Sequence, residues 1–315
     1  MLCTSEEIKK MLLSDLVFTV LFIAQTGIGL LGNSILLMLY LSVFISQPQY
    51  KKTTDLIFGH LTVVNALTLF TQVVPGMVMA FRWESTLDVV GCQLVLYIRR
   101  VARGLSICTT CLLSVFQAIT ISPSNSRWDQ FKHRAPKYIL FAFVLFWSLN
   151  LLLEMNIIKS IANSKNVTVP LKHHSRKTCI SIHYLNKLNS ISFLTAKTLR
   201  DVFFVLVMSC SSGYMVMVLH KHSKRMQHIH STSLSPKTSP ASRATLTILL
   251  LVSCFVSFYF INSSITLALS FIKDNDLNYF DPTLFLGSCY AFLSPLVLII
   301  SDPRISKLSK RQHDL

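Results

Sequence analysis

Three arginines lie inside a stretch of this chain that is otherwise apolar and long enough to cross a lipid bilayer as a helix. Arg99, Arg100 and Arg103 fall in the first half of residues 89–121, and residues 104–121 carry no charge. A charged side chain is costly inside a membrane, so ionisable residues there face the interior of a helix bundle and mark functional sites or internal pairs. These residues predict a polar site within a membrane-embedded bundle, where guanidinium groups can bind an anion.

The three arginines share one side of their expected helix. At about 100° per residue, they fall within an arc of about 100°. Further charged residues lie in later apolar stretches, and we expect them to face the same interior: Glu154, Lys197, Arg200 and Asp201. Together the two groups carry five positive and two negative charges. This balance favours anionic or strongly polar ligands, such as sulfates or carboxylates, which accept charge-assisted hydrogen bonds.

Two roles for these charges are compatible with the sequence. In the first, Arg99 and Arg103 contact a ligand, while other charged residues set the charge of the pocket. In the second, the arginines pair internally with Glu154 and Asp201 and hold the helices together. Both hypotheses use the same residues, so the sequence does not separate them.

The composition indicates that most of the chain lies in a membrane. Of 315 residues, 51% are hydrophobic and 14% are charged, whereas soluble domains have about 25% charged residues. Apolar stretches that reach or approach the roughly 20 residues needed to cross a bilayer occur at 12–45, 56–81, 89–121, 138–158, 191–219, 244–272 and 282–301. We expect an all-α membrane protein with one seven-transmembrane-helix domain, ending in a short basic cytosolic tail at 302–315.

The distribution of basic residues predicts the orientation in the membrane. The net charge is +16, but the Lys and Arg residues lie mainly in the loops between apolar stretches, which argues against a nucleic-acid partner. With the N-terminus outside, the cytosolic segments hold fifteen Lys and Arg residues and the outer segments hold ten. Cytosolic loops of membrane proteins carry such an excess. We expect a multi-pass plasma-membrane protein with an extracellular N-terminus and contacts to membrane lipid.

Covalent features of the outer side follow from the same orientation. Cys92, at the outer end of the third apolar stretch, and Cys179, in the second outer loop, both face an oxidising compartment. We expect them to form a disulfide. Asn166 begins an Asn-Val-Thr sequence in the same loop, so we expect it to be glycosylated.

Two motifs match other chemistries but lie in the wrong context for them. Gly27, Gly29 and Gly32 match a dinucleotide-binding pattern, which requires a preceding strand, whereas apolar helix surrounds it here. Close helix packing through small residues is the better interpretation. Cys108 and Cys111 match a redox motif, but burial in a membrane disfavours the thiolate. We expect no cofactor, no metal site and no enzymatic activity.

The most specific sequence follows the arginines. Residues 109–123 read Thr-Thr-Cys-Leu-Leu-Ser-Val-Phe-Gln-Ala-Ile-Thr-Ile-Ser-Pro, and Ser-Asn-Ser-Arg-Trp follows at 124–128. Together with Leu-Arg-Asp-Val at 199–202 and Ser-Pro-Leu-Val-Leu at 294–298, this sequence closely resembles the vomeronasal type-1 receptors. The resemblance extends from the second to the seventh apolar stretch.

This resemblance implies a rhodopsin-like, seven-helix G-protein-coupled receptor for pheromone-like chemosignals on vomeronasal sensory neurons. The implied partners are a small-molecule chemosignal, which the pocket charge predicts to be anionic or polar, and a heterotrimeric G protein of the inhibitory class. The alternatives are a bitter-taste-like chemoreceptor and, from another class, a small-molecule transporter. A transporter predicts internal repeats and paired broken helices, which the sequence does not display.

The expected inner surface contains several residues that would face the G protein: Gln117, Arg127, Lys132, Arg134, Lys221, Lys224, Arg225 and Arg243. The switch residues differ from those of most rhodopsin-like receptors. Phe-Gln-Ala at 116–118 stands where Asp-Arg-Tyr is usual, so an ionic latch cannot form there. Asn65 replaces the usual sodium-site aspartate, and Ser-Pro at 294–295 replaces Asn-Pro in the last helix. The usual switch residues of this class therefore cannot be transferred to this chain.

Overall fold

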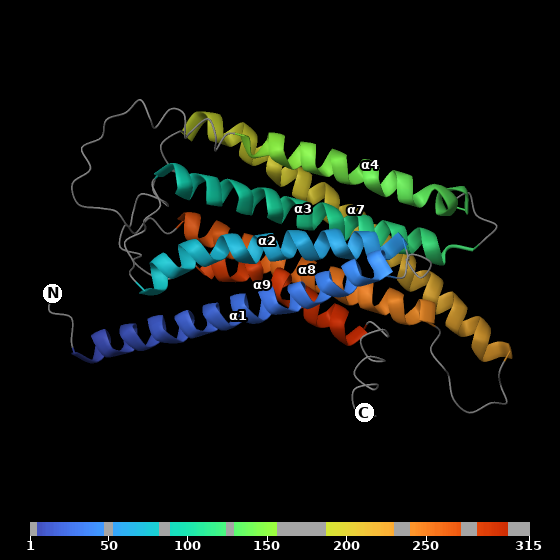
Figure 1. The fold of residues 1–315 in the computed structure, drawn as a ribbon, viewed down its shortest axis with the longest axis horizontal. Helices are drawn as coiled ribbons and strands as arrows, with labels where there is room; N and C mark the ends of the chain where they lie inside the picture. The colour runs from blue at the N-terminus through green and yellow to red at the C-terminus, as the bar shows by residue number, and fades with distance from the viewer. Residues whose placement is uncertain are drawn as a thin grey trace.

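The computed structural model describes residues 5–46, 53–81, 89–123, 129–155, 187–229, 240–271 and 282–301, and nearly all of them are helical. Within these ranges the helices are α1 (Ser5–Ser46), α2 (Thr53–Phe81), α3 (Val89–Ile121), α4 (Asp129–Leu153), α7 (Lys187–Ile229), α8 (Pro240–Phe271) and α9 (Pro282–Ser301). They lie side by side along the long axis of the molecule (Figure 1). The prediction of an all-α, seven-helix membrane fold is confirmed.

Some helices begin and end where the apolar stretches do, whereas others continue into polar sequence. α3 and α9 begin and end where the apolar stretches do. By contrast, α7 continues past residue 219 to Ile229, and α4 begins at Asp129 rather than at 138. Hydropathy marks the part of a helix that suits lipid, whereas polar residues also form helix. At the other end, α4 stops at Leu153, five residues before the expected 158.

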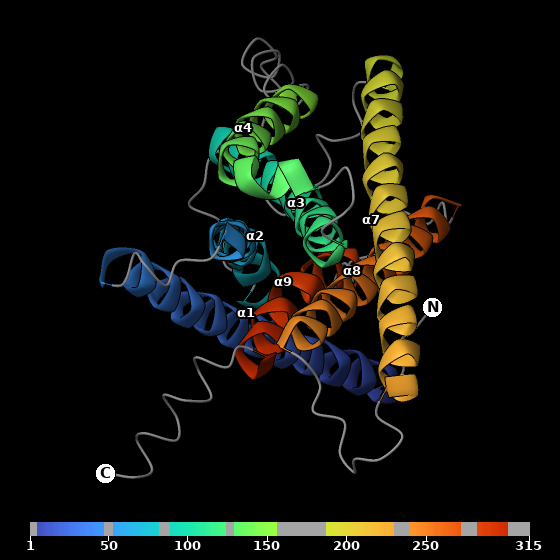
Figure 2. The ribbon, with the colours of Figure 1, turned by 90° about the vertical axis from the view of Figure 1, so that its right-hand side faces the viewer.

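α3 occupies the centre of the bundle. It packs against α2, α4, α7 and α8, and Figure 2 shows it between α2 and α7. In the most apolar 18 residues of Gln93–Ile121, 67% of the residues are buried. The corresponding fraction for Thr195–Lys221 of α7 is 17%. The uncharged C-terminal half of α3 supplies fully buried side chains such as Leu105, Ile107 and Leu113. The arginines in its N-terminal half are partly buried.

Small residues bring α1 close to its neighbours. A Cβ placed on Gly29 would lie 2.8 Å from Leu69 Cδ1 and 3.3 Å from the Phe292 backbone. A Cβ on Gly32 would lie 3.2 Å from Pro295 Cβ. Gly29 and Gly32 thus serve close helix packing, as the sequence predicts, whereas a Cβ on Gly27 would meet no atom within 4 Å.

A polar junction ties α2, α3 and α4 together at His60. Trp147 Nε1 donates to His60 Nε2 at 3.0 Å, and His60 Nδ1 lies 3.0 Å from Thr109 Oγ1. Because the indole nitrogen can only donate, Nε2 must accept and the ring proton must sit on Nδ1, which donates to Thr109. The ring also stacks on Phe143 at 4.1 Å between centroids. The imidazole thus joins three helices as a neutral group.

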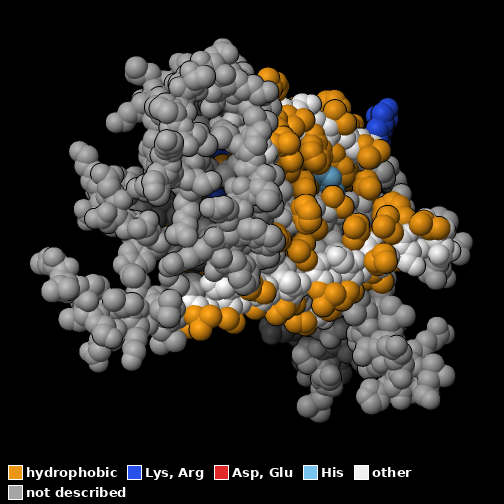
Figure 3. Space-filling view, turned by 60° about the vertical axis from the view of Figure 1, so that its left-hand side comes forward, with side chains coloured by type: hydrophobic (Ala, Val, Ile, Leu, Met, Phe, Trp, Pro, Cys, Tyr) orange, Lys and Arg blue, Asp and Glu red, His pale blue; other side chains and the backbone are white. Residues whose placement is uncertain are grey.

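The outer surface of the described bundle is apolar, as lipid contact requires. Exposed large hydrophobic residues occur on α1, α2, α4, α7, α8 and α9, and Figure 3 shows such side chains spread over the described face. Five described helices contain stretches long and apolar enough to cross a membrane. α4 and α9 carry shorter ones, Lys137–Leu153 and Phe285–Ser301. Exposed apolar area of this extent marks a membrane-embedded surface.

Gly104 is the position where packing around α3 leaves least room. A Cβ there would overlap Asn150 Oδ1 and lie 2.7 Å from Arg200 Nη1. Gly104→Ala should therefore destabilise the receptor by about 1–3 kcal/mol, a typical cost of overpacking. Gly59→Ala is the matched control, because a Cβ on Gly59 meets no atom within 4 Å. Thermal unfolding of the detergent-solubilised protein should give a lower Tm for Gly104→Ala alone, and equal Tm values would contradict the packing described.

Candidate ligand-binding site

Arg200 and Asp201, both on α7, form a buried ion pair in the interior of the bundle. Arg200 donates from Nε to Asp201 Oδ1 at 2.9 Å, and its Nη2 lies 2.7 Å from the same oxygen. Arg200 Nη1 donates to Asn150 Oδ1 of α4 at 2.6 Å. Only 4% of the Arg200 side chain and 9% of the Asp201 side chain are exposed. The charge of Arg200 is therefore paired with Asp201, and its hydrogen bond to Asn150 links α7 to α4.

Two further groups complete this cluster. Tyr259 of α8 donates its hydroxyl to Asp201 Oδ2 at 3.2 Å. Asn150 Nδ2 donates to the Phe146 carbonyl at 2.8 Å, which fixes the amide with its oxygen toward the arginine. Gly104 of α3 provides the space in which this amide and the guanidinium meet. Four helices therefore meet at one buried pair, and removal of one partner of such a pair is strongly destabilising.

Glu154 forms a second charge cluster directly after α4. Its side chain is 2% exposed and lies 3.8 Å from Arg100 Nη1 and 3.4 Å from Lys197 Nζ. Both cations remain about a quarter exposed, at 26% and 28%. Glu154 Oε1 accepts no hydrogen bond from the described residues. One carboxylate thus lies against two cations, and Arg100 turns toward α4 and α7.

Arg99 and Arg103 extend toward α9 instead. The two guanidinium groups approach Gly287, where a Cβ would lie 3.5 Å from Arg103 Nη1 and 3.8 Å from Arg99 Nη2. Asn262 Oδ1 of α8 would lie 4.0 Å from the same point. The structure therefore divides the arginines that the sequence places on one side of a helix. Arg100, at the edge of that arc, contacts Glu154, while the other two point across the bundle.

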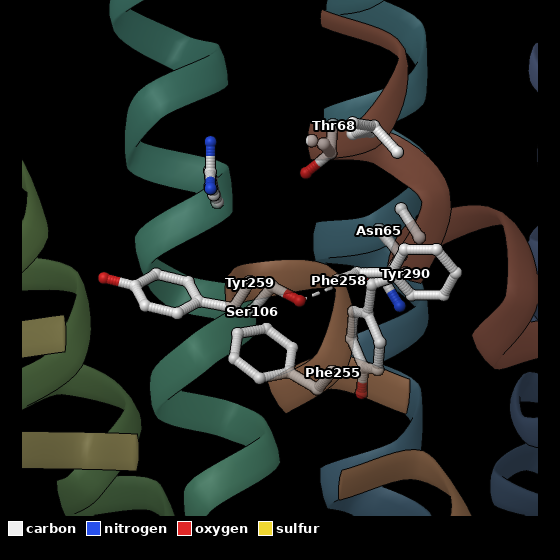
Figure 4. A pocket seen from close by; sticks show the side chains of 11 residues that line it. Asn65, Thr68, Ser106, Phe255, Phe258, Tyr259 and Tyr290 are labelled. Carbon is white, nitrogen blue, oxygen red and sulfur yellow. Dashed lines mark hydrogen bonds between the residues drawn. The ribbon is translucent and has the colours of Figure 1, made fainter. Parts of the chain in front are cut away.

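A pocket between α2, α3, α8 and α9 contains Arg103 and Gly287. Its volume is about 400 Å³, counting the space at its mouth. It is lined by Asn65, Thr68, Arg103, Ser106, Phe255, Phe258, Tyr259, Leu286, Gly287, Tyr290 and Ala291. Figure 4 shows aromatic rings gathered opposite the α3 side chains. Mostly apolar walls with a few convergent polar groups are typical of small-molecule sites.

The floor of the pocket is a chain of hydrogen bonds between neutral groups. Ser106 Oγ donates to Asn65 Oδ1 at 3.0 Å (Figure 4), and Asn65 Nδ2 donates to Ser294 Oγ at 2.7 Å. The Tyr290 hydroxyl lies 2.8 Å from Thr110 Oγ1. These bonds join α2, α3 and α9 beneath the space that a ligand would enter. In the sequence, Asn65 is notable only because it replaces the usual sodium-site aspartate. In the structure it connects α2 to α3 and α9.

Sequence reasoning missed the aromatic part of the lining. Phe255, Tyr259 and Tyr290 lie in apolar stretches where aromatic residues are common and need no special explanation. Gly287 gave no signal either, because a glycine carries no side-chain chemistry. The tyrosines within the apolar stretches could have indicated polar contacts at this site, because a buried hydroxyl requires a hydrogen-bond partner.

At the other end of the bundle, α3 is joined to α7 and α8 by neutral hydrogen bonds. Gln117 Nε2 donates to Thr245 Oγ1 at 3.1 Å, and the Ser122 and Tyr214 hydroxyls lie 2.8 Å apart. Gln117 is buried, whereas other expected G-protein-facing residues are exposed: Arg134, Lys221 and Lys224.

The remaining predicted residues are only partly covered by the structure. Outside the described residues lie Cys179, Asn166, Arg127 and the tail at 302–315. The structure describes only the backbone for a further set: Cys92, Lys132, Arg225 and Arg243. Their assigned roles stay predictions.

The fold and the pocket define the class of protein: an all-α, multi-pass membrane protein whose helices enclose a pocket with mostly apolar walls and a few polar groups. Residues 17–311 match the model of the vomeronasal organ pheromone receptor family. The chain belongs to this family of seven-transmembrane G-protein-coupled receptors, which are not enzymes. The resemblance found in the sequence is thereby confirmed.

Individual relatives cover nearly the whole chain. Vomeronasal type-1 receptor 4 of Pongo pygmaeus is 35% identical over 288 residues, which are 91% of this chain and 95% of the relative. Vomeronasal type-1 receptor 3 of Homo sapiens is 35% identical over 295 residues, covering 93% and 94%. Vomeronasal type-1 receptor 94 of Rattus norvegicus is 33% identical over 289 residues, covering 90% and 86%. Membership implies coupling to a G protein and a small chemosignal as ligand.

The Arg200 cluster generates a stability prediction at Asn150. Asn150→Leu keeps the approximate size but removes the acceptor of Arg200 Nη1, and a hydrogen bond to a charged group contributes about 1.5–3 kcal/mol. We expect lower surface expression and a lower Tm. Ser148→Ala on the same helix is the control, because Ser148 is exposed and bonds only the Val144 carbonyl of its own helix. If the two variants unfold at the same temperature, the cluster does not hold α7 to α4.

Proposed function

We propose that this receptor responds to a small chemosignal that carries an anionic or strongly polar group, and that Arg99 and Arg103 bind that group. The observation that carries the proposal is the approach of both guanidinium groups to Gly287, next to a pocket with aromatic walls. Arg100 and Arg200, by contrast, lie against carboxylates within the bundle. We therefore assign the two roles left open by the sequence to different arginines.

The charge balance supports this assignment. The interior group contains five cations, but only two carboxylates, Glu154 and Asp201. Within this group, the cations therefore outnumber the carboxylates by three, while a further buried carboxylate, Asp55, lies on α2. Excess charge in a medium of low dielectric constant is costly, and an anion from outside relieves that cost. An anionic ligand is therefore favoured over a neutral or cationic one of the same shape.

The walls of the pocket indicate the chemical character of the part of the ligand outside its polar group. Phe255, Phe258 and Tyr290 present aromatic surface, which favours an apolar or ring-containing body. An amphiphilic molecule with a polar group at one end matches both parts of the site. The polar end would lie against α3, and the apolar end between α8 and α9.

Coupling would follow from a shift between two arrangements of the helices. A ligand between α3, α8 and α9 changes the relative stability of those arrangements only through contacts that differ between them. At the inner end, the Gln117–Thr245 and Ser122–Tyr214 hydrogen bonds hold α3 to α8 and α7. Their opening would expose the inner surface to a G protein of the inhibitory class. The basic residues expected there are Arg127, Lys132, Arg134, Lys221, Lys224, Arg225 and Arg243.

The proposal includes the orientation and location of the receptor. The N-terminus would be extracellular, with a Cys92–Cys179 disulfide and a glycan on Asn166 on the outer side. The excess of basic residues in the alternate loops supports this orientation. The cells would be vomeronasal sensory neurons, as family membership suggests.

The ligand assignment can be tested with matched acids and neutral analogues. We expect 2-naphthaleneacetate and 2-naphthyl sulfate to activate the receptor, expressed with a promiscuous G protein, more strongly than 2-naphthaleneethanol. Arg103→Gln should raise the EC50 for the anions about tenfold or more, since charge-assisted bonds contribute about 1.5–3 kcal/mol. Arg100→Gln is the control, and its EC50 should change far less because Arg100 faces Glu154. An equal response to the neutral alcohol, or an unchanged EC50 in Arg103→Gln at normal surface expression, refutes the proposal.

The inner hydrogen bond predicts an effect that needs no ligand. Gln117→Leu and Thr245→Val each remove the 3.1 Å bond between α3 and α8, so basal G-protein signalling per surface receptor should rise. Thr120→Val is the control on α3, because Thr120 is exposed and bonds only the Phe116 carbonyl of its own helix. Basal signalling that stays at the control level in both variants shows that this bond does not restrain coupling.

A further inference from the structure

The helix surface around Gly287 lacks a side chain where polar groups of two other helices converge. Arg99 and Arg103 come from α3, and Asn262 comes from α8. All three place a polar atom within 4.0 Å of the point that a Cβ on Gly287 would occupy. Gly287 itself lines the pocket together with Arg103. Three side chains thus surround a gap on α9.

The gap has a definite size. A single methyl group fits it, because distances of 3.5, 3.8 and 4.0 Å to the surrounding atoms are ordinary van der Waals contacts. A larger side chain would extend beyond the Cβ and occupy the space between the two guanidinium groups. Glycine at this position therefore keeps the pocket open beside the two guanidinium groups. Gly287 lies within helix α9 and has no positive φ, so space rather than torsion explains the glycine.

The groups around this gap are suited to an anion. Two guanidinium groups approach one point, where an oxyanion can accept charge-assisted hydrogen bonds from both. Asn262 is 4% exposed and turns its Oδ1 toward the same point. An amide oxygen there can accept a hydrogen bond from a guanidinium group and hold it in position. This set resembles a cradle for a compact oxyanion.

We propose that Gly287 is a specificity-determining residue: it forms the base of an anion cradle with Arg99, Arg103 and Asn262, and its lack of a side chain sets the size of the anionic group that the receptor accepts. This inference rests on the proposed function for the identity of the ligand, but the cradle itself is a property of the pocket. An anion held there contacts α3, α8 and α9 together. Binding at this point therefore acts on the helices whose inner ends Gln117 and Thr245 join.

The cradle can be measured without knowing the ligand. Gly287→Cys places a thiol in the gap, and its thiolate attacks a methanethiosulfonate to form a disulfide, with methanesulfinate as the leaving group. Two reagents are compared, one carrying a sulfonate and one carrying a trimethylammonium group. Their rates are normalised to those with free 2-mercaptoethanol and corrected for labelling of the unsubstituted receptor. Clefts of one charge raise encounter rates by about 10–1,000-fold, so the sulfonate reagent should react about tenfold faster or more.

The matched control removes one arm of the cradle. In the double variant Arg103→Gln/Gly287→Cys, the preference for the sulfonate reagent should fall several-fold. Leu286→Cys, a neighbouring position in the same pocket, should show a weaker preference than Gly287→Cys. Equal rates for the two reagents, a preference for the cation, or no reaction at 287 in a receptor that reaches the cell surface would each overturn the proposal.

A pair of further variants covers the case in which the cysteine variant does not fold. Gly287→Ala should reach the surface normally, because a Cβ has room, and loss of expression would overturn the description of the gap. Gly287→Val should raise the EC50 for 2-naphthyl sulfate more than Gly287→Ala does, and equal EC50 values would contradict the size limit. If a neutral ligand drives the receptor while the reagent preference holds, the proposed function fails and the cradle stands. If anions activate the receptor without that preference, the cradle alone fails.

Discussion

The cost of placing charge inside a helix bundle governs the arrangement of this receptor's interior. The interior group of charges contains five cationic side chains and two carboxylates, which lie within or directly after apolar helices. A buried ion is tolerated only when it is paired, hydrogen-bonded or reached by water or ligand. The Arg200–Asp201 pair meets the first two conditions through Asn150 and Tyr259. Arg99 and Arg103 lie on the side of the bundle that contains the pocket.

The position of α3 follows from this constraint. Its uncharged C-terminal half is mostly buried, while its N-terminal half carries arginines that extend toward other helices. Gly104 makes the transition possible, because the absence of a side chain lets Arg200 and Asn150 meet against α3. Gly287 has the corresponding role on α9, where it leaves space beside Arg99 and Arg103. One glycine thus allows a structural pair to form, and the other leaves room for a ligand.

The sequence allowed the helices to be predicted well, because long apolar stretches in a lipid environment have few structural alternatives. The bounds of α3 and α9 agree with their apolar stretches, whereas α4 and α7 extend into polar residues that hydropathy does not assign to a helix. The set of interior charges was also identifiable, since charge within an apolar stretch is conspicuous.

The division of labour among those charges could not be predicted. Arg99 and Arg100 are adjacent in sequence, and the direction of each depends on which helix packs on either side of α3. Gly287 could not be found from residue type, because its contribution is empty space between other helices. The aromatic lining of the pocket could not be predicted for a related reason, since phenylalanine and tyrosine in a membrane span usually indicate packing alone. Pairwise contacts between distant helices decide these questions, and a single sequence does not contain them explicitly.

The central claim is that Arg200 holds the bundle together while Arg103 serves the pocket, and a stability comparison tests it most directly. Thermal unfolding would be measured for the purified receptor and for Arg200→Gln and Arg103→Gln, with no ligand present. Arg200→Gln leaves Asp201 buried beside a neutral group, a change that costs about 3–5 kcal/mol, so its Tm should fall strongly. Arg103→Gln leaves the Arg200–Asp201 pair and its bonds to Asn150 and Tyr259 in place and should change the Tm far less. A fall in Tm as large for Arg103→Gln as for Arg200→Gln would contradict the account.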